Sequence, residues 1–228
     1  MKKSARGYEL TKRIFDLIAS GLGLLVLMPS LIIIGLAVRL TSSGPVFFRQ
    51  TRIGRHRKPF TLVKFRTMLV ADNADKSLVT GRDDPRITRL GKLLRRTKLD
   101  ELPELWNVIT GDMSLVGYRP EVSRYVDKYK PEWRQILEMK PGITDPVTLK
   151  FVNEEEVLTG VQDYEKAYLD VILPLKMELI IDYMNKRSFL IDTKIIFQTL
   201  WAITLGRLFA KPDDRLMRLA HERIKMMA

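Results

Sequence analysis

The sequence feature that most constrains the fold is a run of 22 residues, from Leu17 to Val38, without a charged side chain. A straight helix of that length reaches about 33 Å, and the hydrocarbon core of a bilayer is about 30 Å thick. A central helix of a soluble protein is the alternative, but such a helix rarely needs so long an apolar run. A cleaved signal peptide has a shorter apolar stretch and a small-residue cleavage site. The run therefore predicts a membrane segment.

The positive charge of the chain is concentrated around this segment. The 228 residues carry a formal net charge of +12, and residues 1–71 hold +11 of it, with 13 Lys and Arg against two acids. A strongly basic chain raises nucleic acid as a partner. Here, however, the basic clusters flank the most apolar stretch, which favours anionic membrane lipid and no nucleic acid.

Two features favour a membrane segment that enters and returns on the same side. Pro29 lies near its middle, where proline kinks or breaks a helix. Both flanks are basic, so a spanning helix would place one cluster outside, against the positive-inside tendency. A re-entrant helix–break–helix, Leu17–Met28 and Pro29–Val38, keeps both clusters on the cytoplasmic face. Ser30 is then a candidate partner for backbone groups freed at the break. A spanning helix stays open as the alternative.

The basic flank before the segment contains a charged pair at helical spacing. Lys12 and Asp16 lie four residues apart, beside Arg13. They form either an interfacial ion pair that seats the helix or an ordinary solvated pair. We therefore divide the chain into a membrane anchor, residues 1–40, and a cytoplasmic domain, residues 41–228.

The remainder predicts a helix-rich α+β domain. Short strands are expected over 46–50 and 60–66 around a turn at Gly54. Helices are expected from Arg86 onward and over 100–109, 121–138 and 163–186, the last interrupted by Pro174. The C-terminal segment 189–205 mixes large apolar residues with a few polar ones, which predicts an amphipathic interfacial helix. Packing of that helix against the core is an equal alternative.

The most informative polar stretch runs from Arg86 to Glu104. Adjacent carboxylates, Asp100 and Glu101, follow six basic residues: Arg86, Arg89, Lys92, Arg95, Arg96 and Lys98. Guanidinium groups and a helix N-terminus attract phosphate oxygens. The carboxylates could hold Mg²⁺, or one of them could attack phosphorus. Charged helix faces are usually only solvated, so this pattern alone leaves the function open. The chain has no cysteine and two histidines, which excludes disulfides and Cys/His zinc sites.

Six short motifs occur in order along the chain and resemble those of the bacterial sugar transferase family, the monotopic phosphoglycosyl transferases. They are Lys12–Asp16 (KRIFD), Lys64–Met68 (KFRTM), Leu99–Val108 (LDELPELWNV), Gly111–Gly117 (GDMSLVG), Arg119–Pro120 and Pro141–Thr144 (PGIT). The resemblance runs from about residue 12 to residue 205, nearly the whole chain.

This resemblance implies a reaction and a location. Enzymes of the family transfer a sugar 1-phosphate from a nucleotide diphosphate sugar to a polyprenol phosphate such as undecaprenyl phosphate. A nucleoside monophosphate is released. The step is the first membrane step of glycan synthesis, including exopolysaccharide and lipopolysaccharide, at the cytoplasmic face of the bacterial inner membrane. The resemblance also implies Mg²⁺ and a re-entrant helix.

By the same resemblance, Asp100 is the nucleophile that forms a phosphosugar-aspartate. Glu101 would help Asp100 to hold Mg²⁺ or act as a base. Lys64, Arg95 and Arg119, followed by Pro120, would contact phosphate or carboxylate groups.

The chain also departs from the family pattern. Tyr118 stands where the family usually has proline, and Asp145-Pro146-Val147-Thr148 replaces a common Gly-Trp-Ala-Gln, which makes this segment a candidate for substrate specificity. Lys176 and Asp182 are further candidates for lining the site. The rival function is a non-catalytic basic protein that binds anionic lipid or nucleic acid. The sequence leaves the sugar, the nucleotide and the oligomeric state open.

Overall fold

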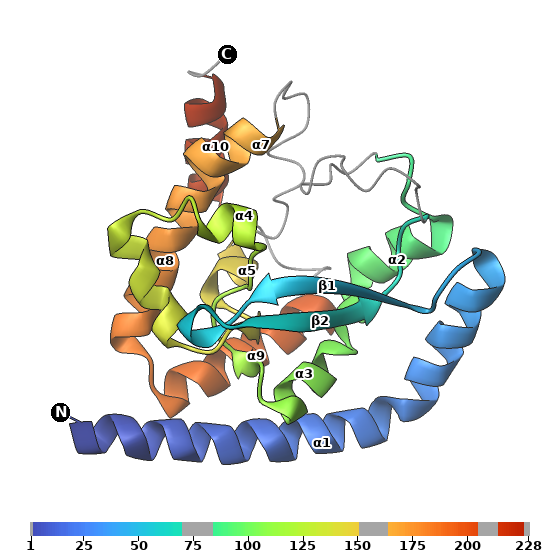
Figure 1. The fold of residues 1–228 in the computed structure, drawn as a ribbon, viewed down its shortest axis with the longest axis horizontal. Helices are drawn as coiled ribbons and strands as arrows, with labels where there is room; N and C mark the ends of the chain where they lie inside the picture. Colours follow the sequence, from blue (N-terminus) through green and yellow to red (C-terminus); the bar gives the residue numbers. More distant parts are fainter. Residues whose placement is uncertain (1, 70–83, 151–163, 205–213, 226–228) are drawn as a thin grey trace.

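The protein is described by a computed structural model over residues 2–69, 84–150, 164–204 and 214–225 (Figure 1). Most of the described chain is helical, and its strands form two separate two-stranded sheets. The predicted helix-rich α+β class is therefore confirmed.

The first part of the described chain contains all four strands. Its elements are α1 (Lys2–Thr41), β1 (Phe47–Ile53), β2 (Pro59–Phe65), α2 (Arg89–Thr97), α3 (Glu104–Thr110), β3 (Ser114–Val116), α4 (Ser123–Val126), β4 (Gly142–Thr144) and α5 (Pro146–Lys150). The later part is helical, with α7 (Tyr164–Ala167), α8 (Leu173–Lys186), α9 (Phe189–Thr204) and α10 (Asp214–Lys225). Short 3-10 turns lie at Arg55–Arg57, Leu99–Glu101 and Pro131–Glu138, and a π-helical turn lies at Tyr168–Ile172.

Helix α1 contains the predicted membrane segment and is bent. It is helical from Lys2 to Thr41, with Pro29 inside it. Figure 1 shows α1 lying along the base of the domain and turning sharply upward in its second half. Pro29 accounts for the bend, because proline lacks the N–H that would bond one turn back and its ring crowds that carbonyl. The predicted break is thus a bend within one helix.

Ser30 does not take the predicted role of a backbone partner. It is exposed, and within the described residues its hydroxyl has no hydrogen-bond partner. The helix continues through Ser30, so few backbone groups there lose their hydrogen-bond partners.

The first half of α1 is joined to the domain by a buried polar group. Lys12 Nζ lies 3.0 Å from Asp192 Oδ2 of α9 and 3.8 Å from Asp16 Oδ1. The hydroxyls of Tyr8 and Tyr183 donate to Asp192 at 2.7 and 2.6 Å. Asp16, which is 2% exposed, accepts from the hydroxyl of Ser114 at 2.7 Å. The pair at residues 12 and 16 is therefore a buried joint and not a solvated surface pair.

Two arginines make further contacts between α1 and the domain. Arg13 donates to the carbonyls of Val108 and Ile109, at 2.6 and 3.0 Å, which caps the C-terminal end of α3. At the other end of α1, Arg66 of the hairpin segment donates to Ser42 O at 2.8 Å.

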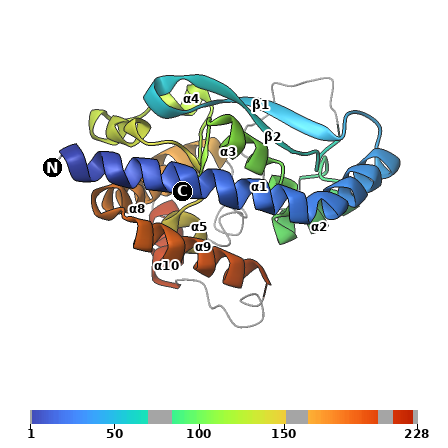
Figure 2. The same cartoon turned by 90° about the horizontal axis from the view of Figure 1, so that it is seen from below.

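The outer surface of α1 is apolar and exposed. Only 6% of its most apolar window is buried inside the structure, so α1 is not the core helix considered as an alternative. Its exposed side chains include Leu10, Leu25, Val26 and Ile33, each at least 64% exposed. Figure 2, seen from below, shows α1 crossing the molecule between the hairpin and helices α8 and α9. By length and composition, the helix could cross a membrane.

Helix α9 has one side in the core and one apolar side outside. Asp192 and Ile195 are buried, whereas Leu190, Phe197 and Trp201 are 56% exposed or more. Core packing and an exposed apolar face thus occur in the same helix.

The predicted hairpin is confirmed: β1 and β2 pair antiparallel, with Phe48 opposite Lys64. The short parallel pair of β3 and β4 was not predicted. In that pair, Ser114 lies opposite Gly142, and Val116 lies opposite Thr144. A Cβ on Gly142 would lie 2.1 Å from the backbone nitrogen of Gly117, so this approach requires glycine. The pairing holds together the loops that follow both strands.

Prolines explain where the helices differ from prediction. The helix expected over 100–109 begins at Glu104, because Pro103 precedes its first turn. The helix expected over 121–138 ends at Val126 and resumes as a 3-10 turn at Pro131. Pro174 does not interrupt its helix, because it occupies the first turn of α8 after the π-helical turn.

The buried joint yields a stability prediction. Asp192→Asn keeps the shape of the side chain but leaves the buried Lys12 ammonium without its closest anion. Breaking a buried pair in this way should lower the free energy of unfolding by about 3–5 kcal/mol. Asp182→Asn, which breaks the exposed pair with Lys186, should cost less than about 1 kcal/mol. Denaturant unfolding in detergent micelles compares the two, and equal losses would contradict the buried joint.

Candidate active site

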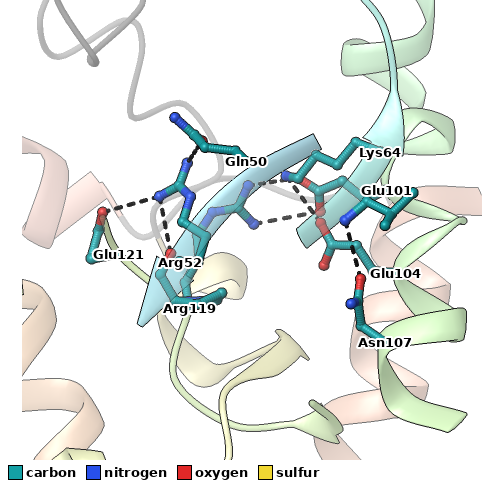
Figure 3. A network of polar contacts seen from close by, with 10 residues as sticks. Gln50, Arg52, Lys64, Glu101, Glu104, Asn107, Arg119 and Glu121 are labelled. Carbon is teal, nitrogen blue, oxygen red and sulfur yellow. Dashed lines mark hydrogen bonds and ion pairs between the residues drawn. The ribbon is translucent and has the colours of Figure 1, made fainter. Parts of the chain in front are cut away.

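The predicted catalytic residues Asp100 and Glu101 lie in one charged group built by three segments, of which Figure 3 labels Lys64, Glu101 and Arg119. Strand β2 supplies Lys64, the turn between α2 and α3 supplies Asp100 and Glu101, and the loop after β3 supplies Arg119. The close-up shows Lys64 and Arg119 converging on Glu101 from different elements. The structure thus brings together residues up to 55 positions apart in sequence, from Lys64 to Arg119.

The local backbone explains how the two carboxylates become buried. Helix α2 ends at Lys98, which adopts a left-handed conformation with φ of 57°. The chain then makes a single 3-10 turn over Leu99–Glu101 before α3 begins. This reversal turns Asp100 and Glu101 into the protein, where they are 7% and 9% exposed.

Glu101 is held as an anion between two cations. Arg119 Nη2 lies 2.6 Å from its Oε1, and Lys64 Nζ lies 3.0 Å from the same oxygen. Burial opposes ionisation, but the Arg119 and Lys64 charges outweigh it and hold the pKa of Glu101 well below its usual value. Glu101 therefore acts as a fixed negative charge that orients both cations.

Asp100 has the opposite environment. Its Oδ1 is buried and, within the described residues, has no hydrogen-bond partner. Burial and then the neighbouring Glu101 charge raise the pKa of Asp100 above its usual value. Adjacent carboxylates with opposite pKa shifts are typical of catalytic pairs in which each has a different role. Of the two carboxylates, Asp100 is the one with a buried oxygen that accepts no hydrogen bond from the described residues.

Glu104 belongs to the same group and was not predicted. Its Oε1 lies 3.0 Å from Lys64 Nζ, and the residue is 2% exposed. Lys64 thus lies at the same distance from Glu101 and Glu104, and burial raises the pKa of Glu104. The sequence signal was the three-residue spacing from Glu101, which places both carboxylates on the same side of a helical turn.

Two further residues hold the site's elements together and were also missed. Asn107 of α3 donates to Thr61 O at 2.8 Å and accepts from Val63 N at 3.1 Å, which joins α3 to β2. Arg52 of β1 donates to Pro120 O at 3.1 Å and pairs with Glu121. The predicted Pro120 thus helps to fix the loop that carries Arg119.

The remaining predicted residues divide into two groups. Asp145 and Lys176 line one cavity of about 50 Å³ together with Arg119 and Tyr118, so they adjoin the charged group. Asp145 is buried and accepts from Thr148 N at 2.6 Å. Burial raises its pKa.

The other predicted residues lie on α8, α2 and α1. Asp182 is on the exposed surface of α8, where it pairs with Lys186 at 2.6 Å. Arg95 lies on α2, with its guanidinium 4.0 Å from Met68 Sδ. Lys12, Arg13 and Asp16 form the joint between α1 and the domain.

The residues of this site would hold Mg²⁺ together with substrate phosphates and not by themselves. Among the described residues, no group of three or more His, Cys, Asp and Glu side chains could hold a metal by itself. Mg²⁺ is commonly held by one or two carboxylates together with substrate phosphates and water. The unbonded Asp100 oxygen beside Glu101 fits that arrangement, in which it would be one protein ligand.

The chain is similar in sequence to a known protein family and to several of its members. The sequence matches the family model described as bacterial sugar transferase over residues 7–206. It is 38% identical over 201 residues to the UDP-glucose:undecaprenyl-phosphate glucose-1-phosphate transferase of Escherichia coli (strain K12). That alignment covers 85% of this chain and 40% of the relative, so the chain spans less than half of that protein's length.

Other relatives are matched over more of their length. A protein of the same name from Caulobacter vibrioides is 34% identical over 194 residues, covering 84% of this chain and 68% of the relative. The exopolysaccharide production protein PSS of Rhizobium leguminosarum bv. phaseoli is 38% identical over 208 residues, covering 87% of this chain and 98% of the relative.

The opposite pKa shifts predict opposite effects on stability. Folding raises the pKa of Asp100, so ionising it costs stability at neutral pH, and Asp100→Asn should raise Tm there. A gain of about 1 kcal/mol would correspond to roughly 2–4 °C. The gain should vanish below about pH 4, where the carboxyl is protonated in both states.

Glu101→Gln provides the matched comparison. Folding lowers the pKa of Glu101, so its charge stabilises the protein at neutral pH and loses that effect as pH falls. This substitution should lower Tm at pH 7. Thermal unfolding from pH 4 to pH 8 tests both variants, and shifts in the same direction would refute the assignment.

Proposed function

Because this chain belongs to the bacterial sugar transferase family, as its motifs predicted, we propose that it transfers a sugar 1-phosphate from a nucleotide diphosphate sugar to a polyprenol phosphate. The observation that carries this proposal is the buried Asp100 carboxylate, which has an unbonded oxygen beside the Lys64–Glu101–Arg119 group. The names of the relatives support a UDP-sugar as donor and undecaprenyl phosphate as acceptor. Synthesis of a secreted polysaccharide is the corresponding process.

The reaction proceeds in two displacements at one phosphorus atom. The Asp100 carboxylate attacks the sugar-side phosphorus of the donor, and the bond to the bridging oxygen breaks. A nucleoside monophosphate leaves with that electron pair, and a phosphosugar-aspartate remains. An oxygen of polyprenol phosphate then attacks the same phosphorus, which releases the carboxylate and yields polyprenol diphosphate sugar. Two steps allow one site to serve a water-soluble donor and then a lipid acceptor.

The charged group provides the electrostatic conditions for this attack. A carboxylate approaches an anionic diphosphate only if the negative charge is neutralised. Lys64 is fixed by Glu101 and Glu104, and Arg119 is fixed by Glu101 while its side chain stays 41% exposed. Arg119 can therefore contact donor phosphate without losing its position. Mg²⁺, held by Asp100 and the donor phosphates with Glu101 alongside, would supply further neutralisation when bound.

The cavity beside Arg119 supports a role in selecting the donor. Asp145 and Thr148 belong to the segment that departs from the family pattern, and both line this cavity with Tyr118 and Lys176. We assign recognition of the sugar or the nucleotide to the side chains of this segment, which lie beside Arg119.

The exposed apolar faces of α1 and α9 support attachment to the membrane. Exposed apolar residues on α1 occur both before and after Pro29, from Leu10 to Leu40. With the bend at Pro29 and basic residues on both flanks, α1 enters the cytoplasmic leaflet and returns, and α9 lies at the interface. The site then lies at the surface of the inner membrane, where the acceptor's phosphate is located.

Activity tests this proposal directly. Asp100→Asn should reduce nucleoside monophosphate release by at least about 10³-fold, because the attacking group is lost. Release is measured with a panel of UDP-sugars, undecaprenyl phosphate and Mg²⁺ in micelles. Asp182→Asn is the matched control and should retain activity, because that carboxylate is exposed and paired with Lys186.

The covalent step has its own measurement. Donor without acceptor should add the mass of a phosphosugar to the peptide containing Asp100, and acceptor should remove it. An adduct on another residue would refute the role of Asp100. A protein that binds anionic lipid equally well with Asp100→Asn, and never releases nucleoside monophosphate, would support the non-catalytic alternative.

Topology is tested with single cysteines, because the chain has none of its own. Lys3→Cys and Ser43→Cys lie on the two flanks of the membrane segment. For a re-entrant helix, an impermeant thiol reagent should label neither position in intact spheroplasts and both after lysis. Labelling of only one position in intact spheroplasts would show a spanning helix.

A further inference from the structure

A second cavity, of about 340 Å³, lies between the first half of α1 and the domain. Its walls come from α1, the turn at Arg55, strand β3, and Lys140 just before β4. None of Lys64, Asp100, Glu101 or Arg119 lines it. The cavity is therefore separate from the charged group described above.

Positive charge predominates in this cavity. Five cations line it, Lys12, Arg13, Arg55, Lys140 and Arg187, against two acids, Glu9 and Asp16. Both acids already have partners: Glu9 pairs with Arg187 at 3.1 Å, and Asp16 accepts from Ser114 and lies beside Lys12. The cavity walls thus provide no spare negative charge.

Two of the cations lack a compensating anion. Within the described residues, neither Arg55 nor Lys140 has a carboxylate at ion-pair distance, and the buried Arg55 Nε has no hydrogen-bond partner. Arg13 beside them is bonded only to backbone carbonyls. Burial and then the Arg13 and Arg55 charges lower the pKa of Lys140, as expected where cations crowd one space. Such a cluster is suited to an anion with several acceptor oxygens.

Apolar side chains of α1 beside the cavity indicate which kind of anion fits it. Leu10 lines the cavity and is 64% exposed, and Ile14, one turn further along α1, is 50% exposed. The cationic space therefore opens beside the apolar face of α1. A molecule with a phosphate next to an acyl chain matches both surfaces, whereas a free anion would use only the first.

We propose that this cavity binds the phosphate group of an anionic phospholipid, with Arg55, Lys140 and Arg13 as its ligands. The phosphate would neutralise the uncompensated cations, and the acyl chains would continue along the exposed face of α1. The lipid source rests on the proposed membrane attachment of α1, whereas the phosphate site rests on the cavity alone. Bound lipid would stabilise the contact between α1 and the domain.

Thermal unfolding of the full chain in neutral detergent tests the site. Dihexanoyl-phosphatidylglycerol, at about 100 times its Kd, should raise Tm of the unmodified protein by roughly 5–10 °C. Arg55→Gln/Lys140→Gln should lose most of this shift. Lys130→Gln/Arg134→Gln removes two exposed charges elsewhere and should retain it.

Inorganic phosphate is the second arm and distinguishes the source of the anion. If phosphate alone produces the full shift, the site is a free-anion site and the lipid proposal is wrong. No shift with either compound, or an equal shift in the Arg55/Lys140 variant, would overturn the site altogether.

Two control measurements separate loss of the lipid site from effects on folding and on catalysis. Without lipid, the Arg55/Lys140 variant should unfold no earlier than the unmodified protein, because it loses crowded like charges. If it unfolds earlier, the single variant Lys140→Gln replaces it, and a lipid shift as large as that of the unmodified protein would overturn the role of Lys140. Nucleoside monophosphate release by these variants in detergent should persist, so a failed lipid site is distinguishable from a failed catalytic proposal.

Discussion

The structure depends on one buried polar joint between an apolar helix and a folded domain. The second half of α1 packs against Phe65 and Leu94 through Val38, whereas the outer face of the helix is apolar and exposed. The contact of Lys12 with Asp192, and of Asp16 with Ser114, fixes the first half through charges that cannot remain unpaired when buried. Arg13 adds a directional contact to the end of α3. These contacts hold α3, β3 and α9 against the first half of α1.

In the active site, too, buried charged side chains are held by ion pairs. Lys64 and Arg119 are held by Glu101, and this leaves Asp100 as the carboxylate with an unsatisfied oxygen. An unsatisfied buried group costs stability, and such costs are typical of functional sites, where reactivity requires them. Glu104 contributes a third carboxylate that shares Lys64. The site therefore gathers carboxylates whose negative charge must be balanced by cations, namely Lys64, Arg119 and, in the proposed reaction, Mg²⁺.

Features formed by residues close together in sequence were predicted. Contacts between residues distant in sequence were missed. The apolar run, the hairpin and the pair Asp100–Glu101 were all visible from composition and spacing. Pairing of β3 with β4 was not, because three-residue strands have no readable period and the contact depends on Gly117 and Gly142 approaching closely. Glu104 and Arg52 were missed because their partners are distant in sequence. Asp182 was grouped with the site because its helix enters the site's cavity at Lys176, while its own face turns outward.

The short helix α3 has a mechanical consequence. Its C-terminal end is held by Arg13 of α1, and its N-terminal end follows directly from the turn that contains Asp100. Seven residues at about 1.5 Å each make a spacer of about 10 Å. With α1 seated in the leaflet as proposed, α3 sets the height of the reacting carboxylate above the lipid surface. One inserted residue would both lengthen this spacer and rotate the carboxylate by about 100° around its axis. The length of α3 therefore sets the separation between the Arg13 contact on α1 and the turn that carries Asp100.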